Sequence, residues 1–482
     1  MFGRTNMNAA GLPATAITDE MAIAIDRWVA LYYSKTDVLA NNKLSMGLPA
    51  SIAREMATLV TLEAQVNVGN AASAQDEEGE PVLNPRAEFI KETLKQVLDQ
   101  LPVQTEYACA FGGVAFRPYI DGDAIAIDCI NADNFYPTSF NKRGEITGAV
   151  FIEKKKQEKD CYFRMEEHRM GDNGTYLITN RAYKAMGNTN SANGGIGTPC
   201  PLTEVDEWRD ISPEVELTGI YSPLFSYFRI PHGNVIDVDS PLGVSVYAEP
   251  DNAGILDEVD KQLQRLSWEY DGGQMAIDAN VTAFKTDDEG HPILPEGRER
   301  LYRVNNLIDD EGSGRGKFDI FAPALRDSSY AQGLNRLLMR VEDMTGLARG
   351  TFSDANESVR TATELKISKQ RTYATVTGIQ KSLQDAIDKL AEAINIEATL
   401  YNLAPEGEYT ITYAWDDSIV VDASAEREID RADVLDGIME AWEYRVKWYG
   451  ETPAQAKAAV SGNKPVEEAV NGTEGEEEPE IE

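Results

Sequence analysis

The chain has 482 residues, which at about 100–200 residues per domain predicts roughly three domains. Hydrophobic residues make up 42% of it, which is enough for a sizeable folded core and excludes global disorder. The formal net charge is −36, and a protein this acidic is repelled by nucleic acids and by anionic membranes. Because tight nonspecific DNA binding needs a basic surface, any role on DNA must be one of weak contact.

The cysteines and the chain start bear on the compartment. The first residues show no signal-peptide pattern, and no uncharged apolar run approaches the roughly 18 residues that span a bilayer. The cysteines form no C-x-x-C pair, so neither a zinc ribbon nor a redox motif is expected, and free thiols suit a reducing cytoplasm. These four cysteines are Cys109, Cys129, Cys161 and Cys200.

The N-terminal part is predicted to be helical. A capped helix begins at Thr18 and Asp19 and carries a mostly apolar run. A second helix is expected over 49–65 and a third over 85–101, with an acidic loop at 70–85 between them.

From about residue 108 to 228 the pattern changes to short β-prone runs that alternate with turn residues. This predicts a meander of antiparallel strands, with clear candidates at 148–156, 160–168 and 175–183. A Gly-, Asn- and Ser-rich stretch at 186–200 predicts a surface loop.

Apolar residues return at helical spacing after Pro250, which predicts a helix over about 252–275 and a second over 328–346. Between them lies a predicted small α+β insertion. Its short β-prone runs are at 281–284, 301–307 and 318–321.

The rest of the chain is predicted to be mainly helical. An irregular polar segment at 348–358 leads into a long helix over about 361–402, on the order of 60 Å long. A short strand at 409–414 and a helical hairpin at 426–449 and 452–460 follow. The tail from Lys464 carries eight glutamates and is expected to be disordered.

Motifs for catalysis are absent from the sequence. The segment 312–318 lacks the first glycine and the Ser/Thr of a phosphate-binding loop. The three histidines are scattered outside any metal-binding frame. His168, beside Glu166 and Glu167, could act as a base, but an exposed histidine at a strand end is the favoured interpretation. We therefore expect no enzyme activity, no cofactor and no metal.

Several segments, taken in their order, resemble portal proteins of siphophages that infect Gram-positive hosts. The resemblance runs from about residue 20 to 460, and it rests on the order and spacing of the segments rather than on one motif. The segments are DDSIVVD at 416–422, GIMEAWEYR at 437–445, WYGE at 448–451, TATEL at 361–365, ADNFYP at 132–137 and SPLGVS at 240–245.

The resemblance implies an α+β portal fold that forms a ring, twelve-fold in the virion, around a DNA channel at one capsid vertex. The subunit would be in the host cytoplasm during assembly. The implied divisions are an N-terminal wing at 1–250, a first stem helix at 251–279, a clip at 280–327, a second stem helix at 328–347, a tunnel loop at 348–360, a long helix and wing return at 361–424, a crown at 425–463 and a disordered acidic tail at 464–482.

The implied partners are other copies of the chain, the terminase large subunit, the head-completion adaptor, and the major capsid and scaffolding proteins. Double-stranded DNA would pass through without sequence recognition, and no membrane is involved. The resemblance places partner docking on the clip, whose basic candidates are Lys285, Arg298, Arg300, Arg315 and Lys317.

The tunnel loop is where we expect shallow phosphate contact. Alternatively, Arg349 and Arg360 pair with neighbouring acids such as Asp354 and Glu357. The candidate DNA-facing residues are Arg349, Ser353, Asp354, Asn356, Ser358 and Arg360.

Two further expectations concern contacts between subunits. The clip runs at 281–284 and 318–321 could pair between neighbours, because exposed strand edges are often covered by a partner. The first stem helix could turn a polar face to the channel, although a helical pair inside a monomeric domain fits equally well. That polar face consists of Asp257, Glu258, Asp260, Lys261 and Arg265.

The net charge favours a passive acidic conduit that repels the duplex and keeps it centred. Two alternatives stay open. One is a different ring-forming head or tail component, such as an adaptor, which is usually much shorter. The other is a DNA-packaging enzyme, which would need a phosphate-binding loop or a carboxylate metal site.

Overall fold

The computed structural model describes residues 16–34, 44–70, 84–157, 160–186, 197–280, 284–289, 291–294, 302–305, 318–354, 362–415, 423–449, 456–457 and 459–460. The chain forms two compact units, Met1–Trp415 and Asp416–Glu482, and each is treated by itself. Helices and strands are mixed, which confirms the α+β class. In the part of the chain that the structure describes, no helix is long and apolar enough to cross a membrane.

The first unit opens with helices that begin where the sequence provides caps or prolines. The Thr18 side chain accepts the Met21 N–H at the start of α2, and Asn84 accepts the Ala87 N–H at the start of α4. Pro49 and Pro102 lie in the first turns of α3 and α5, where a missing N–H costs nothing. These helices are α2 (Asp19–Tyr32), α3 (Leu48–Thr61), α4 (Pro85–Leu98) and α5 (Leu101–Phe111).

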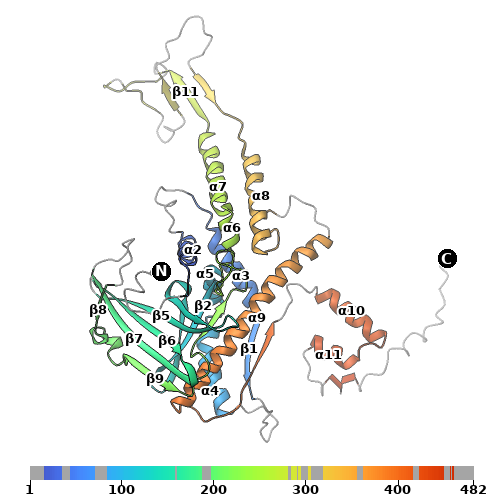
Figure 1. Cartoon of the computed structure of the whole chain (residues 1–482). Coiled ribbons are helices and arrows are strands. Elements are labelled where there is room, and N and C mark those ends of the chain that lie inside the picture. Colours follow the sequence, from blue (N-terminus) through green and yellow to red (C-terminus); the bar gives the residue numbers. More distant parts are fainter. Residues whose placement is uncertain are drawn as a thin grey trace, which may run out of the picture. The chain divides into compact units, whose positions relative to one another are not determined.

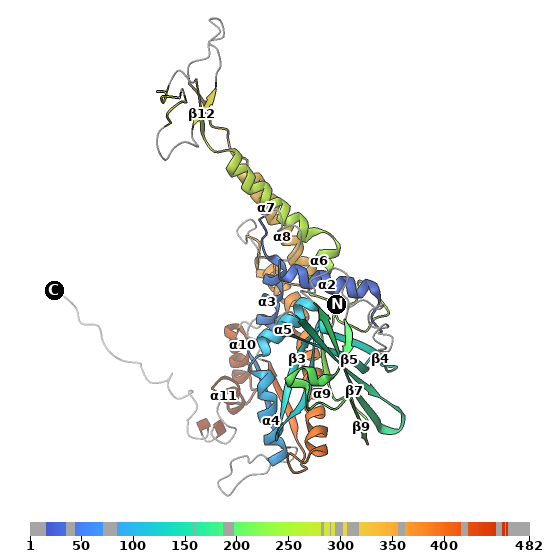
Figure 2. The same cartoon turned by 90° about the vertical axis from the view of Figure 1, so that its left-hand side faces the viewer.

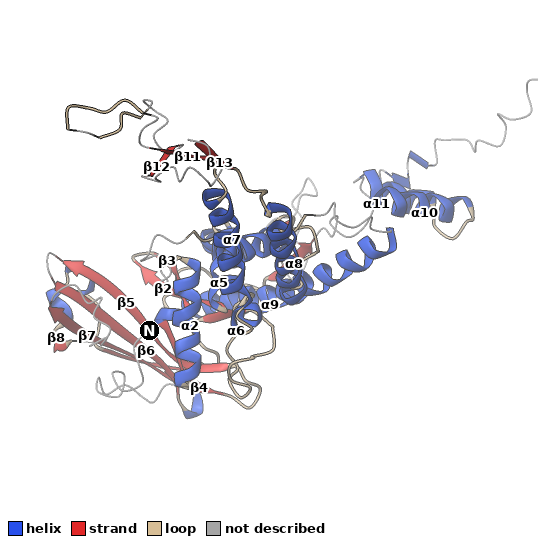
Figure 3. Cartoon of the chain, turned by 90° about the horizontal axis from the view of Figure 1, so that it is seen from above, coloured by secondary structure: helices blue, strands red, loops and turns tan. Residues whose placement is uncertain are grey.

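The predicted antiparallel meander is confirmed, and it divides into two sheets. The larger sheet has the order β4-β5-β6-β7-β8, and β9 also pairs with β7 (Figure 3). The smaller sheet has the order β10-β2-β3. The strands are β2 (Gly113–Asp121), β3 (Ala124–Asn131), β4 (Phe135–Phe140), β5 (Ile146–Gln157), β6 (Asp160–Met170), β7 (Thr175–Met186), β8 (Thr198–Cys200), β9 (Glu214–Thr218) and β10 (Ser226–Arg229).

The long helix α9 (Ala362–Leu400) is the central element of the first unit. It contacts α3, α4, β2 and β10, and its predicted apolar positions are fully buried (Figure 1). After α9 the chain returns as β14 (Thr410–Trp415), which pairs antiparallel with β1 (Ala64–Gly69). The buried apolar positions are Ile379, Leu383, Ile387, Leu390 and Ile394.

Two helices of the first unit, α7 (Ile255–Gly272) and α8 (Asp327–Thr345), pack against each other and lead to a three-stranded sheet (Figures 1 and 2). A short helix, α6 (Ala248–Asn252), precedes them. The sheet has the order β12-β11-β13, with β11 parallel to β12 and antiparallel to β13. Its strands are β11 (Ala276–Asn280), β12 (Tyr302–Asn305) and β13 (Phe318–Phe321). Strands are therefore present where the insertion was predicted, but the described residues between α7 and α8 contain no helix, and β11 lies before the predicted run at 281–284, of which 281–283 are outside the described residues.

The second unit contains α10 (Ala423–Leu435) and α11 (Ala441–Tyr449). The Trp448 Nε1–H donates to Asp430 at 2.8 Å, and Lys447 pairs with the same carboxylate at 2.6 Å, which joins the two helices. One continuous helix over 426–449 was predicted and is wrong. The chain turns at Gly437, whose φ of +71° is a left-handed conformation that glycine adopts without strain.

Two other element predictions are corrected. The helix expected over 49–65 ends at Thr61, and β1 follows it. The strand region expected from 108 begins only at 113, because α5 continues to Phe111. The predicted disordered tail lies outside the described residues.

Candidate functional site

The segment after α8 folds around a buried acid, Glu342, whose side chain is 0% exposed. Its carboxylate accepts the backbone N–H of Phe352 at 2.6 Å and that of Ser353 at 2.8 Å. It also accepts the Gly350 N–H at 3.2 Å and the Ser353 hydroxyl at 2.8 Å. Several convergent donors compensate for the loss of water around a buried carboxylate, so this acid is built into the fold of the loop.

The neighbouring acid, Asp343, holds the loop from another side. It accepts two hydrogen bonds from the Arg349 guanidinium, at 2.9 and 2.6 Å, and lies 3.5 Å from Arg371 of α9. Hydrogen bonding from Arg349 lowers the pKa of Asp343. A single carboxylate therefore contacts both the loop and the long helix.

The loop leaves α8 at Gly346, whose φ is +77°. A Cβ at this position would lie 2.5 Å from the Thr375 Oγ1 on α9, so only glycine fits both the turn and the close approach. Leu347, the next residue, is buried. Farther along, the Asp354 N–H donates to the Asn335 side chain of α8 at 2.7 Å. The loop is thus anchored as far as Asp354.

The structure places three of the predicted DNA-facing residues. Arg349 pairs with an acid, as the alternative interpretation expected, but the acid is Asp343 rather than Asp354. Ser353 is buried with its hydroxyl on Glu342, so its side chain is not offered to solvent. Asp354 is exposed. Asn356, Glu357, Ser358 and Arg360 lie outside the described residues.

The polar face predicted for the first helix of the pair is divided in the structure. Asp257 lies 3.7 Å from Arg27, and Asp260 accepts hydrogen bonds from Ser45 and from the Met46 N–H, so these two acids contact other parts of the same chain. The remaining members pair among themselves on the surface, with Glu258 between Lys261 and Arg265. Asp257 is nevertheless exposed, whereas Asp260 and Glu258 are half-buried, so both groups reach the surface.

The outer end of the α7–α8 pair and the sheet beyond it expose large apolar side chains. Trp268 is 66% exposed on α7 and Ile320 is 64% exposed on β13. Within this end, the Arg326 guanidinium donates to Glu269 at 3.1 and 2.8 Å and ties the two helices together. Lys285 is exposed. The other basic clip candidates, Arg298, Arg300, Arg315 and Lys317, lie outside the described residues. Other exposed apolar side chains here are Tyr270, Met275, Ile293, Phe321 and Leu325.

The first unit contains a buried polar cluster that was not predicted from the sequence. Arg117 of β2 lies 3.1 Å from Glu166 of β6, and His168 lies 2.7 Å from the same carboxylate. Burial acts to raise the pKa of Glu166, but Arg117 and His168 outweigh it and lower the pKa. His168 is buried and contacts the Tyr176 hydroxyl, so the predicted exposed strand-end histidine is wrong.

Glu397 near the end of α9 is a second buried acid that the sequence did not single out. Its side chain is 6% exposed, and its Oε2 has no hydrogen-bond partner. Burial, with the nearby Glu166 charge, raises the pKa of Glu397 to about 8.

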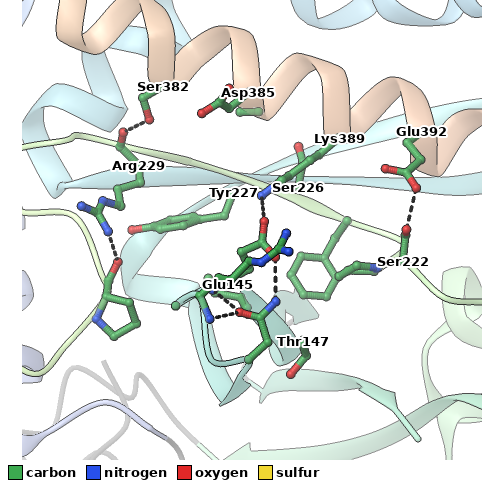
Figure 4. A pocket seen from close by; sticks show the side chains of 18 of the residues that line it. Glu145, Thr147, Ser222, Ser226, Tyr227, Arg229, Ser382, Asp385, Lys389 and Glu392 are labelled. Atoms are coloured by element: carbon green, nitrogen blue, oxygen red, sulfur yellow. Dashed lines mark hydrogen bonds and ion pairs between the residues drawn. The ribbon is translucent and has the colours of Figure 1, made fainter. Parts of the chain in front are cut away.

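A cleft of about 610 Å³ lies beside α9, next to the turn between β4 and β5 (Figure 4). Polar bridges cross it: Lys389 pairs with Glu145 at 3.0 Å, and the Ser222 hydroxyl donates to Glu392 at 2.5 Å. The first bridge joins α9 to the β4–β5 hairpin, and the second joins α9 to the segment between β9 and β10. Among the residues whose side chains are described, no group of three or more His, Cys, Asp or Glu could hold a metal ion.

The chain was compared with protein families, curated protein sequences and solved structures. A family model described as "Phage portal protein, SPP1 Gp6-like" matches residues 15–440. Comparison with curated protein sequences found no match. Among solved structures, the chain is similar to one titled "Neck of native GTA particle computed with C12 symmetry", with 12% identity, a TM-score of 0.37, and coverage of 92% of this chain and 97% of that one.

Proposed function

Because the chain belongs to the SPP1 Gp6-like family of phage portal proteins, a structural rather than enzymatic family, we propose that it is a ring-forming channel subunit at one vertex of a phage capsid. The ring is twelve-fold in the virion and passes double-stranded DNA during packaging, retention and ejection. The subunit assembles in the host cytoplasm, and its partners include the major capsid and scaffolding proteins.

The observation that carries this proposal is the exposed apolar surface at the outer end of α7 and α8. An isolated helical pair that leaves Trp268 and Tyr270 in water is poorly suited to a monomer. Neighbouring copies in a ring would cover these side chains. The exposure of these side chains therefore favours a ring over the alternative of a helical pair inside a monomeric domain.

In this proposal α7 and α8 form the stem of the ring subunit, and the other parts of the chain are assigned relative to this stem. The clip at 280–327 docks the terminase large subunit and later the head-completion adaptor. The wing is built by residues 1–250 and 361–424, and the crown by 425–463.

The edges of the clip sheet are candidates for pairing between subunits. Within the described residues β12 and β13 each pair on one side only, with β11, so their outer edges are available. Phe318–Phe321 pairs inside its own subunit on its inner edge, and its outer edge is the one we propose for a neighbour.

The proposed contact with DNA is confined to the far part of the tunnel loop. Arg349 is paired with Asp343 and Ser353 is buried, so both leave the proposed DNA-facing set. Asp354, Asn356, Ser358 and Arg360 remain. With a net charge of −36 per subunit, the ring as a whole repels DNA and keeps it centred, which lowers friction.

The test has two parts. Electron microscopy of the purified protein is expected to show rings with a central hole, and particles that stay monomeric at micromolar concentration would refute the proposal. Replacing residues 355–360 with glycine should then impair DNA packaging while leaving the rings intact. A basic channel wall in a reconstruction of the ring would contradict the low-friction conduit.

A further inference from the structure

The adjacent acids Glu342 and Asp343 at the end of α8 both contact the loop that follows the helix. The backbone N–H groups of three residues near the end of this loop, Gly350, Phe352 and Ser353, all donate to the Glu342 carboxylate. Successive amides converging on an anion form a concave binding site like those that hold phosphate. Here the anion is part of the protein.

We propose that Glu342 and Asp343 form a positioning clamp that folds residues 346–353 onto α8 and α9 and so sets where the tunnel loop enters the channel. The role of that loop on DNA rests on the proposed function. The clamp itself does not, because it concerns contacts inside one subunit.

The loop depends on Glu342 for its own conformation. Without the carboxylate, the Phe352 and Ser353 N–H groups and the Ser353 hydroxyl would lose their acceptor beside a buried side chain, and the Gly350 N–H would keep only the Ser353 Oγ. An amide at position 342 keeps the shape but replaces one acceptor oxygen with a donor, which would face the N–H groups that now bind there. Glu342→Gln is therefore a nearly isosteric change that specifically opens the loop.

Asp343 couples the loop to a second element. Consecutive helical residues point about 100° apart, so Asp343 reaches a side of α8 that Glu342 does not. There it contacts Arg349 of the loop and Arg371 of α9. A displacement of the loop would therefore disturb the contacts of Asp343 with both the loop and α9. Through these contacts, α9 couples the position of the loop to the rest of the subunit.

Tryptic cleavage after Arg349 tests the clamp without any assay of DNA packaging. Its side chain is 53% exposed, so trypsin can recognise it, but cleavage requires the backbone around 349–350 to leave its fold. We expect Glu342→Gln to raise the rate of cleavage after Arg349 about tenfold relative to cleavage after the exposed Lys285 in the same molecule, since losing hydrogen bonds to a buried charge shifts the opening equilibrium by at least that much.

The matched control is Glu397→Gln, a second buried glutamate, 6% exposed and without contact to the loop. This control should leave the cleavage ratio unchanged. An unchanged ratio in Glu342→Gln would overturn the clamp. So would a uniform rise at every site together with a lower Tm, because that pattern shows general destabilisation rather than a loop held locally.

Two further variants test the coupling. Arg371→Gln should raise cleavage after Arg349 by a smaller factor, about twofold to threefold, since it removes only the longer contact of Asp343. No change in this variant would overturn the coupling to α9. If Glu342→Gln opens the loop but DNA packaging by variant rings is normal, the clamp stands and the proposed role of the loop falls.

Discussion

The two ends of the α7–α8 pair are built from the same helical pattern and have opposite surroundings. At the inner end, Val259 and Val341 are fully buried and Glu342 has all its hydrogen bonds inside the fold. At the outer end, Trp268 is 66% exposed, and the Glu269–Arg326 pair is a tie between the helices. One end is thus completed within the subunit, whereas the other leaves large apolar side chains in solvent, and we propose that a neighbouring subunit covers them.

The largest expected effect comes from removing the exposed aromatic group at the outer end. Trp268→Ala should abolish or strongly reduce rings, because truncating a tryptophan that is a hot spot of an interface commonly costs about 2 kcal/mol or more in binding free energy. Mass photometry or negative-stain imaging measures the ring fraction. The control Ile23→Ala, at a position 69% exposed on α2, should leave rings intact; equal ring fractions in both variants would remove the distinction between the two ends.

The inner end should respond in subunit stability instead. Leu338→Ala leaves a cavity in a packed core and should lower the free energy of unfolding by about 2–4 kcal/mol. Trp268→Ala should change the same quantity in the dissociated subunit by less than about 0.5 kcal/mol. Urea unfolding below the assembly concentration measures the free energy of unfolding of both variants. Similar losses of stability in both would contradict the idea that only the inner end of the α7–α8 pair is completed within the subunit.

A smaller effect is expected at the tie of the outer end. Arg326→Gln should speed hydrogen exchange of the β11 amides, because it loosens the junction between α8 and the β12-β11-β13 sheet. Arg326 lowers the pKa of Glu269, so the tie holds above the ordinary glutamate pKa and is lost as the pH falls through the lowered value. The difference between wild type and variant should therefore shrink as the pH falls below about 4. A difference that stays constant into acid would show that the ion pair is not its cause.

A separate, pH-dependent effect concerns the end of α9 that carries Glu397, an acid without the donors that Glu342 has. Its pKa is raised to about 8, so the folded state retains a proton that the unfolded chain releases, and stability falls as the pH rises from the ordinary glutamate value of about 4 to 8. Glu397→Gln should remove this loss. The Tm advantage of the variant should widen from pH 5 to pH 8, and a gap independent of pH would show that Glu397 is ionised in the fold.

Long periodic helices were predictable, and so was the insertion between them. The observed α7, α8 and α9 lie within a few residues of the predicted ranges, because an apolar stripe at every third or fourth residue has one simple explanation. The end of α5 was not predictable in this way. Tyr107 to Phe111 is almost continuously apolar, and such a run fits a buried strand as well as a buried helix.

The candidate site was predictable in position but not in contacts. Glycine and polar residues after α8 indicated a loop, yet nothing local distinguished Glu342 from the other acids of the chain. Its role depends on a turn at Gly346 that brings residues 350–353 back onto the helix. The pairing of Arg349 with Asp343 rather than Asp354 depends on the same turn.

By itself the sequence determined the order of the main helical and strand regions, although not α5 or β1, together with the acidic character of the subunit and the absence of catalytic motifs. Each of these follows from local spacing or from composition. Only the tertiary structure decided which acids are buried and what they hold. The pairing of β1 with β14, almost 350 residues later, and the burial of Glu342, Glu166 and Glu397 come from contacts between distant segments. Such contacts are set by how whole elements pack, and no local pattern records them.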